Sequence, residues 1–151
     1  MDIAVLGLGH VGATMAACLV RDGHRVLGID VHPEKIAAVA AGRAPIVEPQ
    51  VGDWLAAGVA ERRLRAARSL DDARDGLDIV FVCVGTPARA DGAIDLSHVL
   101  GCTDEIGRAA RARAAAQPLL VVYRSTMAPG SMERQVLPRL QRAAGAPRGS
   151  R

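Results

Sequence analysis

Aromatic residues are nearly absent from this sequence, which has one Trp, one Tyr and one Phe among 151 residues. Its core must therefore be packed from aliphatic side chains, as the buried strands of parallel sheets usually are. Nucleic-acid binding by stacking is excluded, because that mode combines aromatic rings with clustered basic residues. The net charge of +3 comes from scattered arginines, with Lys35 as the only lysine. We expect no nucleic-acid partner.

Paired or clustered cysteines are also lacking. Cys18, Cys83 and Cys102 are far apart, show no C-x-x-C spacing, and each falls within an apolar helix or strand pattern. Such residues are typical of small buried side chains in a reducing compartment. A catalytic thiolate needs an exposed, electropositive pocket. We therefore predict no metal site and no catalytic residue in this chain.

No apolar run approaches the about 20 residues that a membrane-spanning helix needs. The apolar N-terminus does not resemble a secretion signal, because Asp2 stands where such signals are basic and glycines interrupt the run. We expect a cytoplasmic protein without a membrane partner.

Short apolar runs alternate with helical patterns along the chain. Strands are predicted at 3–6, 25–29, 64–67, 78–84 and 118–124. Helices are predicted at 13–20, 34–41, 51–60 and 131–144, the last interrupted by Pro138, and a further helix follows Asp95 as its N-cap and reaches about residue 115. A short helix is predicted to open at Ser69. Right-handed crossovers between such elements give an α/β fold, a doubly wound parallel sheet with helices on both faces. We expect a single domain over residues 1–144 and a C-terminal tail over 145–151.

Residues Gly7-Leu8-Gly9-His10-Val11-Gly12 form a G-x-G-x-x-G motif where the first strand turns into the first helix. In this motif Gly7 permits the tight turn, Gly9 lets the backbone approach a pyrophosphate, and Gly12 lets the helix pack on the strand. The helix N-terminus then faces the anion. This context predicts a Rossmann-type dinucleotide site, in preference to a glycine-rich turn that binds no nucleotide.

Asp30 ends the second strand at the distance expected of a ribose partner. Its carboxylate can accept hydrogen bonds from both hydroxyls of the adenosine ribose. A 2′-phosphate there would bring like charges together. The predicted cofactor is therefore NAD rather than NADP.

Polar segments follow the two strongest later strands, at 84–87 and at 124–126, and a Pro-Gly turn follows at 129–130. Open α/β sheets bind ligands at the carboxyl ends of their strands. Thr86 and Thr126 offer hydroxyl groups there. The alternative is that these residues only form turns.

Several segments together resemble the UDP-glucose/GDP-mannose dehydrogenases. They lie at 7–12, 45–49 (Pro-Ile-Val-Glu-Pro), 83–87 (Cys-Val-Gly-Thr-Pro), 91–96 (Asp-Gly-Ala-Ile-Asp-Leu) and 124–126 (Arg-Ser-Thr), in the family's order and spacing. The resemblance extends from Met1 to about Gly145. Beyond the three glycines of the motif, it implies NAD contacts at His10, Val11, Asp30, Lys35, Thr86 and Thr126.

Two residues depart from the family's pattern. His10 stands where tyrosine is more common, and Gln50 stands where glycine commonly follows the second proline. Neither change removes a group that cofactor binding requires. Lys35 either reaches the adenosine end of the cofactor or lies in solvent, and contact is the favoured interpretation.

Members of this family oxidise the C6 alcohol of a nucleotide sugar to a carboxylate with two NAD, using a cysteine that lies far downstream. The sequence contains neither that cysteine nor the substrate domain, and the family's last Rossmann strand is missing as well. The resemblance thus implies an NAD-binding domain that binds cofactor without oxidising sugar, because nothing orients the substrate. A nucleotide sugar would be a partner only if the missing domains were supplied. Segments 45–49 and 136–140 resemble GDP-mannose enzymes slightly more than UDP-glucose enzymes.

Two other interpretations remain open. One is a non-catalytic NAD-sensing module like the regulatory domains of potassium channels, whose later segments are not expected to contain Val-Gly-Thr-Pro or Arg-Ser-Thr. The other is an interaction domain that forms a homodimer or docks on a full-length enzyme. Titration with NAD and size-exclusion chromatography distinguish them.

Overall fold

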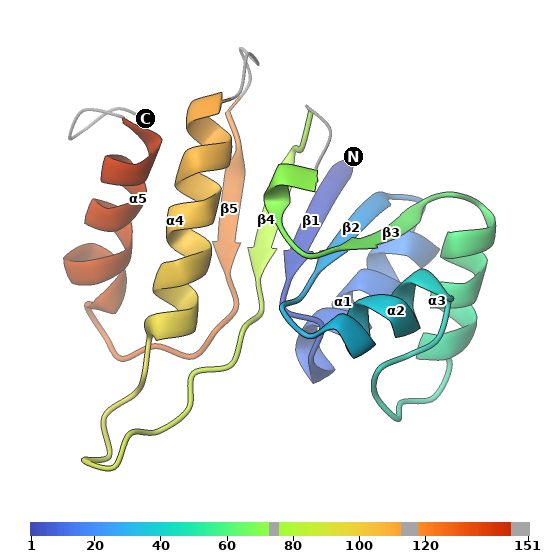
Figure 1. Ribbon diagram of the computed structural model, residues 1–151, viewed down its shortest axis with the longest axis horizontal. Helices are drawn as coiled ribbons and strands as arrows, with labels where there is room; N and C mark the ends of the chain where they lie inside the picture. The colour runs from blue at the N-terminus through green and yellow to red at the C-terminus, as the bar shows by residue number, and fades with distance from the viewer. Residues whose placement is uncertain (73–75, 113–117, 146–151) are drawn as a thin grey trace.

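The computed structural model describes residues 1–72, 76–112 and 118–145. Its centre is a five-stranded parallel sheet with the strand order β3-β2-β1-β4-β5. The strands are β1 (Asp2–Leu6), β2 (Arg25–Ile29), β3 (Leu64–Ala67), β4 (Ile79–Val82) and β5 (Leu120–Tyr123). All carboxyl ends share one edge of the sheet, the lower edge in Figure 1. This is the order of the first five strands of a doubly wound dinucleotide-binding sheet, which confirms the predicted fold class.

Helices cover both faces of the sheet. They are α1 (His10–Arg21), α2 (Pro33–Ala40), α3 (Val51–Ala60), α4 (Ser97–Ala112) and α5 (Leu137–Ala144). Alternate residues of β1 enter opposite clusters, because successive side chains of a strand point to opposite faces. Val5 packs with residues of α1, α2 and α3, whereas Ala4 and Leu6 pack with Ile106 of α4. Figure 1 shows α4 and α5 together over one half of the molecule and α1, α2 and α3 over the other.

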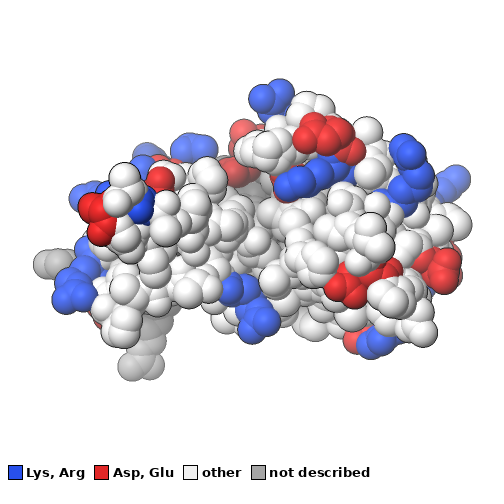
Figure 2. Space-filling view, turned by 90° about the horizontal axis from the view of Figure 1, so that it is seen from below, with Lys and Arg blue, Asp and Glu red and all other residues white. Residues whose placement is uncertain are grey.

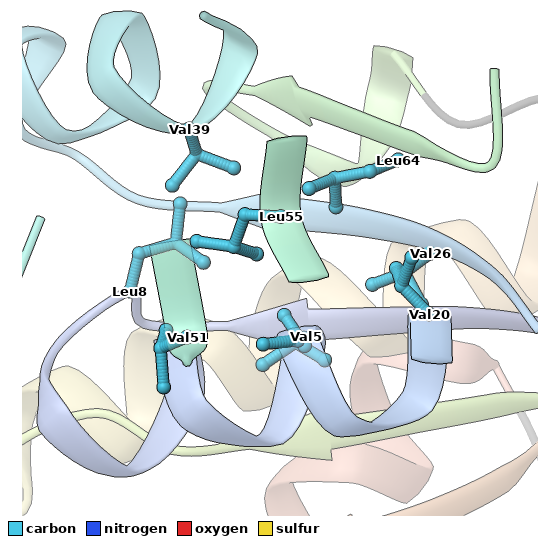
Figure 3. Close-up of a cluster of buried hydrophobic side chains, with 10 residues drawn as sticks. Val5, Leu8, Val20, Val26, Val39, Val51, Leu55 and Leu64 are labelled. Carbon is cyan, nitrogen blue, oxygen red and sulfur yellow. The ribbon is translucent and has the colours of Figure 1, made fainter. Parts of the chain in front are cut away.

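The first of these clusters anchors the glycine-rich turn. Leu8, which lies inside the turn, is fully buried and packs among Val39 of α2 and Val51 and Leu55 of α3 (Figure 3). Room for it comes from Gly28 of β2, where an added Cβ would lie 2.9 Å from a Leu8 methyl group. The turn is therefore held by core packing as well as by its own backbone.

Several predicted boundaries differ from the structure. β4 ends at Val82 and β5 covers only Leu120–Tyr123, although the Cys83 amide still donates to the Leu6 carbonyl at 2.7 Å. The capping role predicted for Asp95 is confirmed, because α4 begins at Ser97, whose amide donates to the Asp95 carboxylate at 2.8 Å. The apolar pattern in the sequence extends beyond the paired residues of β4 and β5, so it predicted both strands too long. The predicted end of that helix, near residue 115, lies outside the described residues.

The last helical segment is interrupted, as Pro138 predicted. Residues Met132–Val136 form a π-helical turn, and the α-helical pattern resumes in α5 at Leu137, one residue before the proline. A proline lacks the amide hydrogen that regular α-helical bonding would use, so the wider turn accommodates it. Gly145 ends α5 with a φ of +66°. The predicted domain limit at 144 stays a prediction, because 146–151 lie outside the described residues.

None of the helices within the three described ranges is long and apolar enough to span a membrane.

Candidate functional site

The turn after β1 requires glycine at Gly7. Its φ of +93° lies in the left-handed region that disfavours a side chain, and a Cβ there would lie 2.9 Å from the Cys83 carbonyl oxygen. The Gly7 amide donates to the Ile29 carbonyl at 2.7 Å. The turn is thereby packed between the ends of β2 and β4.

Gly9 and Gly12 have opposite surroundings. A Cβ on Gly12 would lie 1.7 Å from the Gly7 carbonyl oxygen, so α1 packs directly on the turn. A Cβ on Gly9 would meet no atom of the described chain within 4 Å. Gly12 is thus needed for packing, whereas Gly9 leaves open space at the start of α1.

The N-terminal end of α1 is available to an anion. Gly9 is the N-cap residue and makes no side-chain cap, and the first turn of α1 contains no acidic residue. The first amides of a helix lack helical acceptors and carry partial positive charge. His10 and Val11, both exposed, flank this end. Open space beside uncapped amides fits a cofactor diphosphate.

The carboxylate of Asp30 ties the end of β2 to the same turn. Only 6% of this side chain is exposed. Its Oδ2 accepts a hydrogen bond from the Leu8 amide at 2.7 Å, and its Oδ1 accepts one from the His32 amide at 2.9 Å. Lys35 Nζ donates to Oδ2 at 3.3 Å. Oδ1 keeps further acceptor capacity, which suits a ribose hydroxyl.

The ionisation of Asp30 is set by competing effects. Burial, the largest of them, raises the pKa of this carboxyl, but the amides of His32 and Leu8 and the nearby Lys35 together outweigh it. The resulting pKa lies below the ordinary value, so the group is charged at neutral pH. A 2′-phosphate placed beside it would be repelled.

His10 contacts a distant segment, and the sequence analysis did not predict this contact. Its Nε2 lies 2.5 Å from Glu48 Oε1, in the Pro45–Pro49 segment between α2 and α3. Ile46 of that segment packs against the first core cluster, whereas Val47 is 98% exposed. The contact holds the His10 imidazole beside the open end of α1. No sequence pattern predicted the role of Glu48.

The loops after β4 and β5 form the other side of the site. Thr86, which is half-buried, follows β4, and Thr126, which is exposed, follows β5. The Ser125 hydroxyl donates to the Val84 carbonyl at 2.7 Å and joins the two loops. The sequence placed this serine in a polar segment but assigned it no role.

The predicted residues gather along one edge of the sheet, in two groups. Those at the ends of β1 and β2 are Gly7, Gly9, His10, Val11, Gly12, Asp30 and Lys35. Thr86 and Thr126 follow β4 and β5 on the neighbouring half. Figure 2 looks onto this edge and shows the surface hollowed between the two halves, with mostly uncharged atoms in the hollow. The contacts of these nine residues with a cofactor stay predictions.

The cysteines beside the site are held as neutral thiols. Burial raises the pKa of Cys83 to about 11 and that of Cys102 to about 12, so neither is a thiolate at neutral pH. All three cysteines are free. Within the described ranges, no cluster of three or more His, Cys, Asp or Glu side chains is placed to hold a metal ion.

Comparisons with known proteins agree with this geometry. The model of the UDP-glucose/GDP-mannose dehydrogenase family, NAD binding domain, matches residues 1–148. GDP-mannose 6-dehydrogenase of Azotobacter vinelandii is 37% identical over 149 residues, which are 99% of this chain and 34% of that protein. UDP-glucose 6-dehydrogenase of Pseudomonas aeruginosa is 35% identical over 134 residues, covering 89% of this chain and 28% of that protein.

A solved structure shows the same arrangement of elements. The crystal structure of a ternary complex of GDP-mannose dehydrogenase from Pseudomonas aeruginosa matches with a TM-score of 0.90 and 38% identity, over 96% of this chain and 33% of that chain. This chain therefore spans about a third of the length of the relatives it matches.

The predicted resemblance is confirmed, with its slight preference for GDP-mannose enzymes. Because the matching model describes an NAD-binding domain, the predicted cofactor is confirmed as well. The match is to the NAD-binding domain of a dehydrogenase family, whereas the alternative interpretation was a potassium-channel type of NAD sensor. This chain belongs to the UDP-glucose/GDP-mannose dehydrogenase family, of which it forms the NAD-binding domain.

Proposed function

We propose that this chain holds NAD for a nucleotide-sugar 6-dehydrogenase that oxidises the C6 alcohol of GDP-mannose, or of UDP-glucose, to a carboxylate. Two NAD are used, because each accepts one hydride. GDP-mannose is the preferred substrate in this proposal, because its dehydrogenases match a larger share of the chain. Cytoplasmic location is part of the proposal and is supported by the three free cysteines.

The open N-terminal end of α1 is the observation that carries this proposal. It combines the space at Gly9 with uncapped amides, and the buried Asp30 carboxylate bonds to the Leu8 amide of the same turn. In the proposed complex these amides bind the diphosphate, and Asp30 accepts a ribose hydroxyl. Lys35 lies at the adenosine end, His10 and Val11 flank the diphosphate, and Thr86 and Thr126 face the nicotinamide half.

On its own, the chain is proposed to bind NAD without oxidising sugar. Cys83 and Cys102 are neutral thiols, unsuited to attack a carbonyl carbon. Orientation of the C6 atom against the cofactor would come from other domains, and it supplies a large part of enzymatic rate acceleration.

Calorimetric titration with NAD and NADP tests the binding site. We expect NADP to bind at least about tenfold more weakly than NAD, since two like charges would meet at Asp30. Asp30→Ala should weaken NAD binding by about tenfold or more and narrow the difference between the cofactors. Asp53→Ala, which removes an exposed carboxylate from the first turn of α3, is the matched control and should change neither. Equal affinities of the unaltered chain for NAD and NADP would contradict the assignment of Asp30.

A second experiment separates a dehydrogenase domain from an NAD sensor. The chain alone, mixed with NAD and either GDP-mannose or UDP-glucose, should produce no NADH absorbance. Supplying the remaining domains of a family member in trans, or by fusion, should restore turnover with GDP-mannose. Sugar oxidation by the chain alone would refute the proposed division of labour. Homodimer formation stays a prediction, which light scattering at two protein concentrations tests.

A further inference from the structure

Ser125 joins the ends of two strands beyond their last backbone hydrogen bond. Val82 and Tyr123 are the last paired residues of β4 and β5, and the Arg124 amide donates to the Val82 carbonyl at 2.8 Å. One residue further on, the Ser125 hydroxyl lies 2.7 Å from the Val84 carbonyl oxygen and 3.4 Å from that of Val82. A side chain thus continues the pairing where the backbone ladder stops.

The segment that Ser125 holds also packs against the glycine-rich turn. A Cβ on Gly7 would lie 3.0 Å from the Val84 amide nitrogen and 2.9 Å from the Cys83 carbonyl oxygen. Val84 therefore lies between Gly7 on one side and Ser125 on the other. Thr86 follows Val84 by two residues and Thr126 follows Ser125 directly, so the hydroxyl joins the two loops close to both threonines.

These loops lie on the half of the sheet that the adenosine does not use. A doubly wound sheet binds a dinucleotide across its crevice, with one mononucleotide on each half. In the proposed function Asp30 binds the adenosine ribose, which places the adenosine beside β1 and β2. The loops after β4 and β5 are therefore left for the nicotinamide half, a step that rests on the proposed function.

We propose that Ser125 is a positioning residue for the nicotinamide half of the cofactor. Its hydroxyl holds the Val84 carbonyl and keeps Thr86 and Thr126 at the spacing that this half requires. Without the hydroxyl, the half-buried Val84 carbonyl loses its partner and the two loops are free to separate. The adenosine half keeps its hydrogen bonds, because Asp30 bonds to Leu8, His32 and Lys35. Gly7 also stays bonded to the Ile29 carbonyl when the Ser125 hydroxyl is lost.

Titration of Ser125→Ala with NAD and with ADP-ribose, which lacks the nicotinamide, tests this role. We expect the Kd for NAD to rise by about fivefold to tenfold, as for one lost hydrogen bond. The Kd for ADP-ribose should stay within about twofold. Ser125→Thr keeps the hydroxyl and should bind NAD within about threefold of the unaltered chain.

Thr103→Val is the matched control for a merely structural hydroxyl. Thr103 Oγ1 donates to the Val99 carbonyl at 2.8 Å and lies 3.0 Å from Tyr123 Oη, between α4 and β5. Its loss should lower the Tm as Ser125→Ala does and leave both ligand affinities unchanged. An equal effect of Thr103→Val on NAD binding would show that stability alone explains the result.

The outcomes for the inference and for the proposed function are distinct. If Ser125→Ala weakens both ligands equally, or weakens neither, the positioning role is refuted and the NAD site stands. A threonine variant that binds NAD as weakly as the alanine variant also refutes it. If the unaltered chain binds neither ligand, the proposed function fails, and the inference fails with it.

Discussion

The two halves of the sheet hold their parts of the site by different means. In the half with β1, α1 and β2, backbone packs on backbone, so closely that a Cβ on Gly12 would lie 1.7 Å from the Gly7 carbonyl oxygen. In the half with β4, α4 and β5, a side-chain hydroxyl joins the two loops, at Ser125. A substitution that adds a Cβ to a close backbone contact forces the backbone to shift. A substitution that removes the Ser125 hydroxyl loses only one hydrogen bond. The first half should therefore respond to substitution abruptly and the second gradually.

Gly12→Ala should have the largest effect, because neither atom of the clash can move without shifting the turn or α1. We expect a loss of about 3 kcal/mol or more in the free energy of unfolding, and no measurable NAD binding. Chemical denaturation and calorimetry measure the two effects.

Gly107→Ala is the counterpart in the other half. Its Cβ would lie 2.3 Å from the Ala143 Cβ, where α4 packs on α5. We expect a loss of about 1 to 3 kcal/mol, partly offset by better helix propensity, with NAD affinity unchanged. Loss of NAD binding in Gly107→Ala that matches the loss in Gly12→Ala would remove the distinction between the halves.

Gly9→Ala should separate binding from folding within the first half. Gly9 has a φ of −77°, which any residue adopts, and a Cβ there meets no atom of the described chain within 4 Å. The methyl group would instead fill the space proposed for the diphosphate. We expect NAD affinity to fall by about thirtyfold while the Tm changes by less than about 2 °C. Unchanged affinity would place the diphosphate elsewhere.

The pH dependence of stability can be compared for one carboxylate from each half, Asp30 and Asp104. The pKa of Asp30 lies below 3.8, and in α4 the hydrogen bond from Arg139 is the main cause that lowers the pKa of Asp104 below the same value. Each charged form therefore stabilises the fold above about pH 4, and this contribution is lost as the pH falls through the lowered pKa. Asp30→Asn should remove about 1.5 kcal/mol at pH 7 and make the acid loss shallower.

Only the first of these carboxylates should matter for the cofactor. Asp104→Asn should also flatten the acid denaturation profile, while leaving NAD affinity at pH 7 as in the unaltered chain. Thermal unfolding between pH 3 and 7 and calorimetry at pH 7 measure both variants. An acid profile of Asp30→Asn that matches the unaltered chain would show that the buried carboxylate is not stabilised in its charged form.

Gln50→Gly should have the smallest effect and should increase stability. Gln50 adopts a φ of +66° at the start of α3, a conformation that glycine reaches with less strain. We expect a gain of about 0.5 to 1 kcal/mol in unfolding free energy, with NAD affinity unchanged. The structure thus explains why glycine suits this position after the second proline. A lower Tm would show that the glutamine stabilises the turn by another contact.

Features that depend on neighbouring residues were predicted well. The alternation of strands and helices, the glycine-rich turn and the acidic end of β2 follow from local periodicity and spacing, and the structure confirms each of them. Boundaries were less accurate: apolar residues continue through Cys83 and Val84, although the pairing of β4 ends at Val82. Where a strand ends depends on its neighbours, which periodicity does not contain.

Contacts between distant segments were not predicted. Glu48 meets His10 across 38 positions, and Ser125 meets Val84 across 41. Both residues lie in segments that had been recognised as polar or as part of the family's pattern. No local rule indicated what their side chains contact.

By itself, the sequence determined that this chain folds as a Rossmann-type domain and that its cofactor is NAD. The fold depends on backbone constraints, since only glycine fits at Gly7 and Gly12, and the choice of NAD depends on the charge of Asp30 at the end of β2. Both requirements can be recognised from residue identity and spacing. The tertiary structure alone decided how the second half of the site is assembled. Side-chain hydrogen bonds such as that of Ser125 form only once β4 and β5 lie side by side, and many sequences place a serine after a strand without forming one.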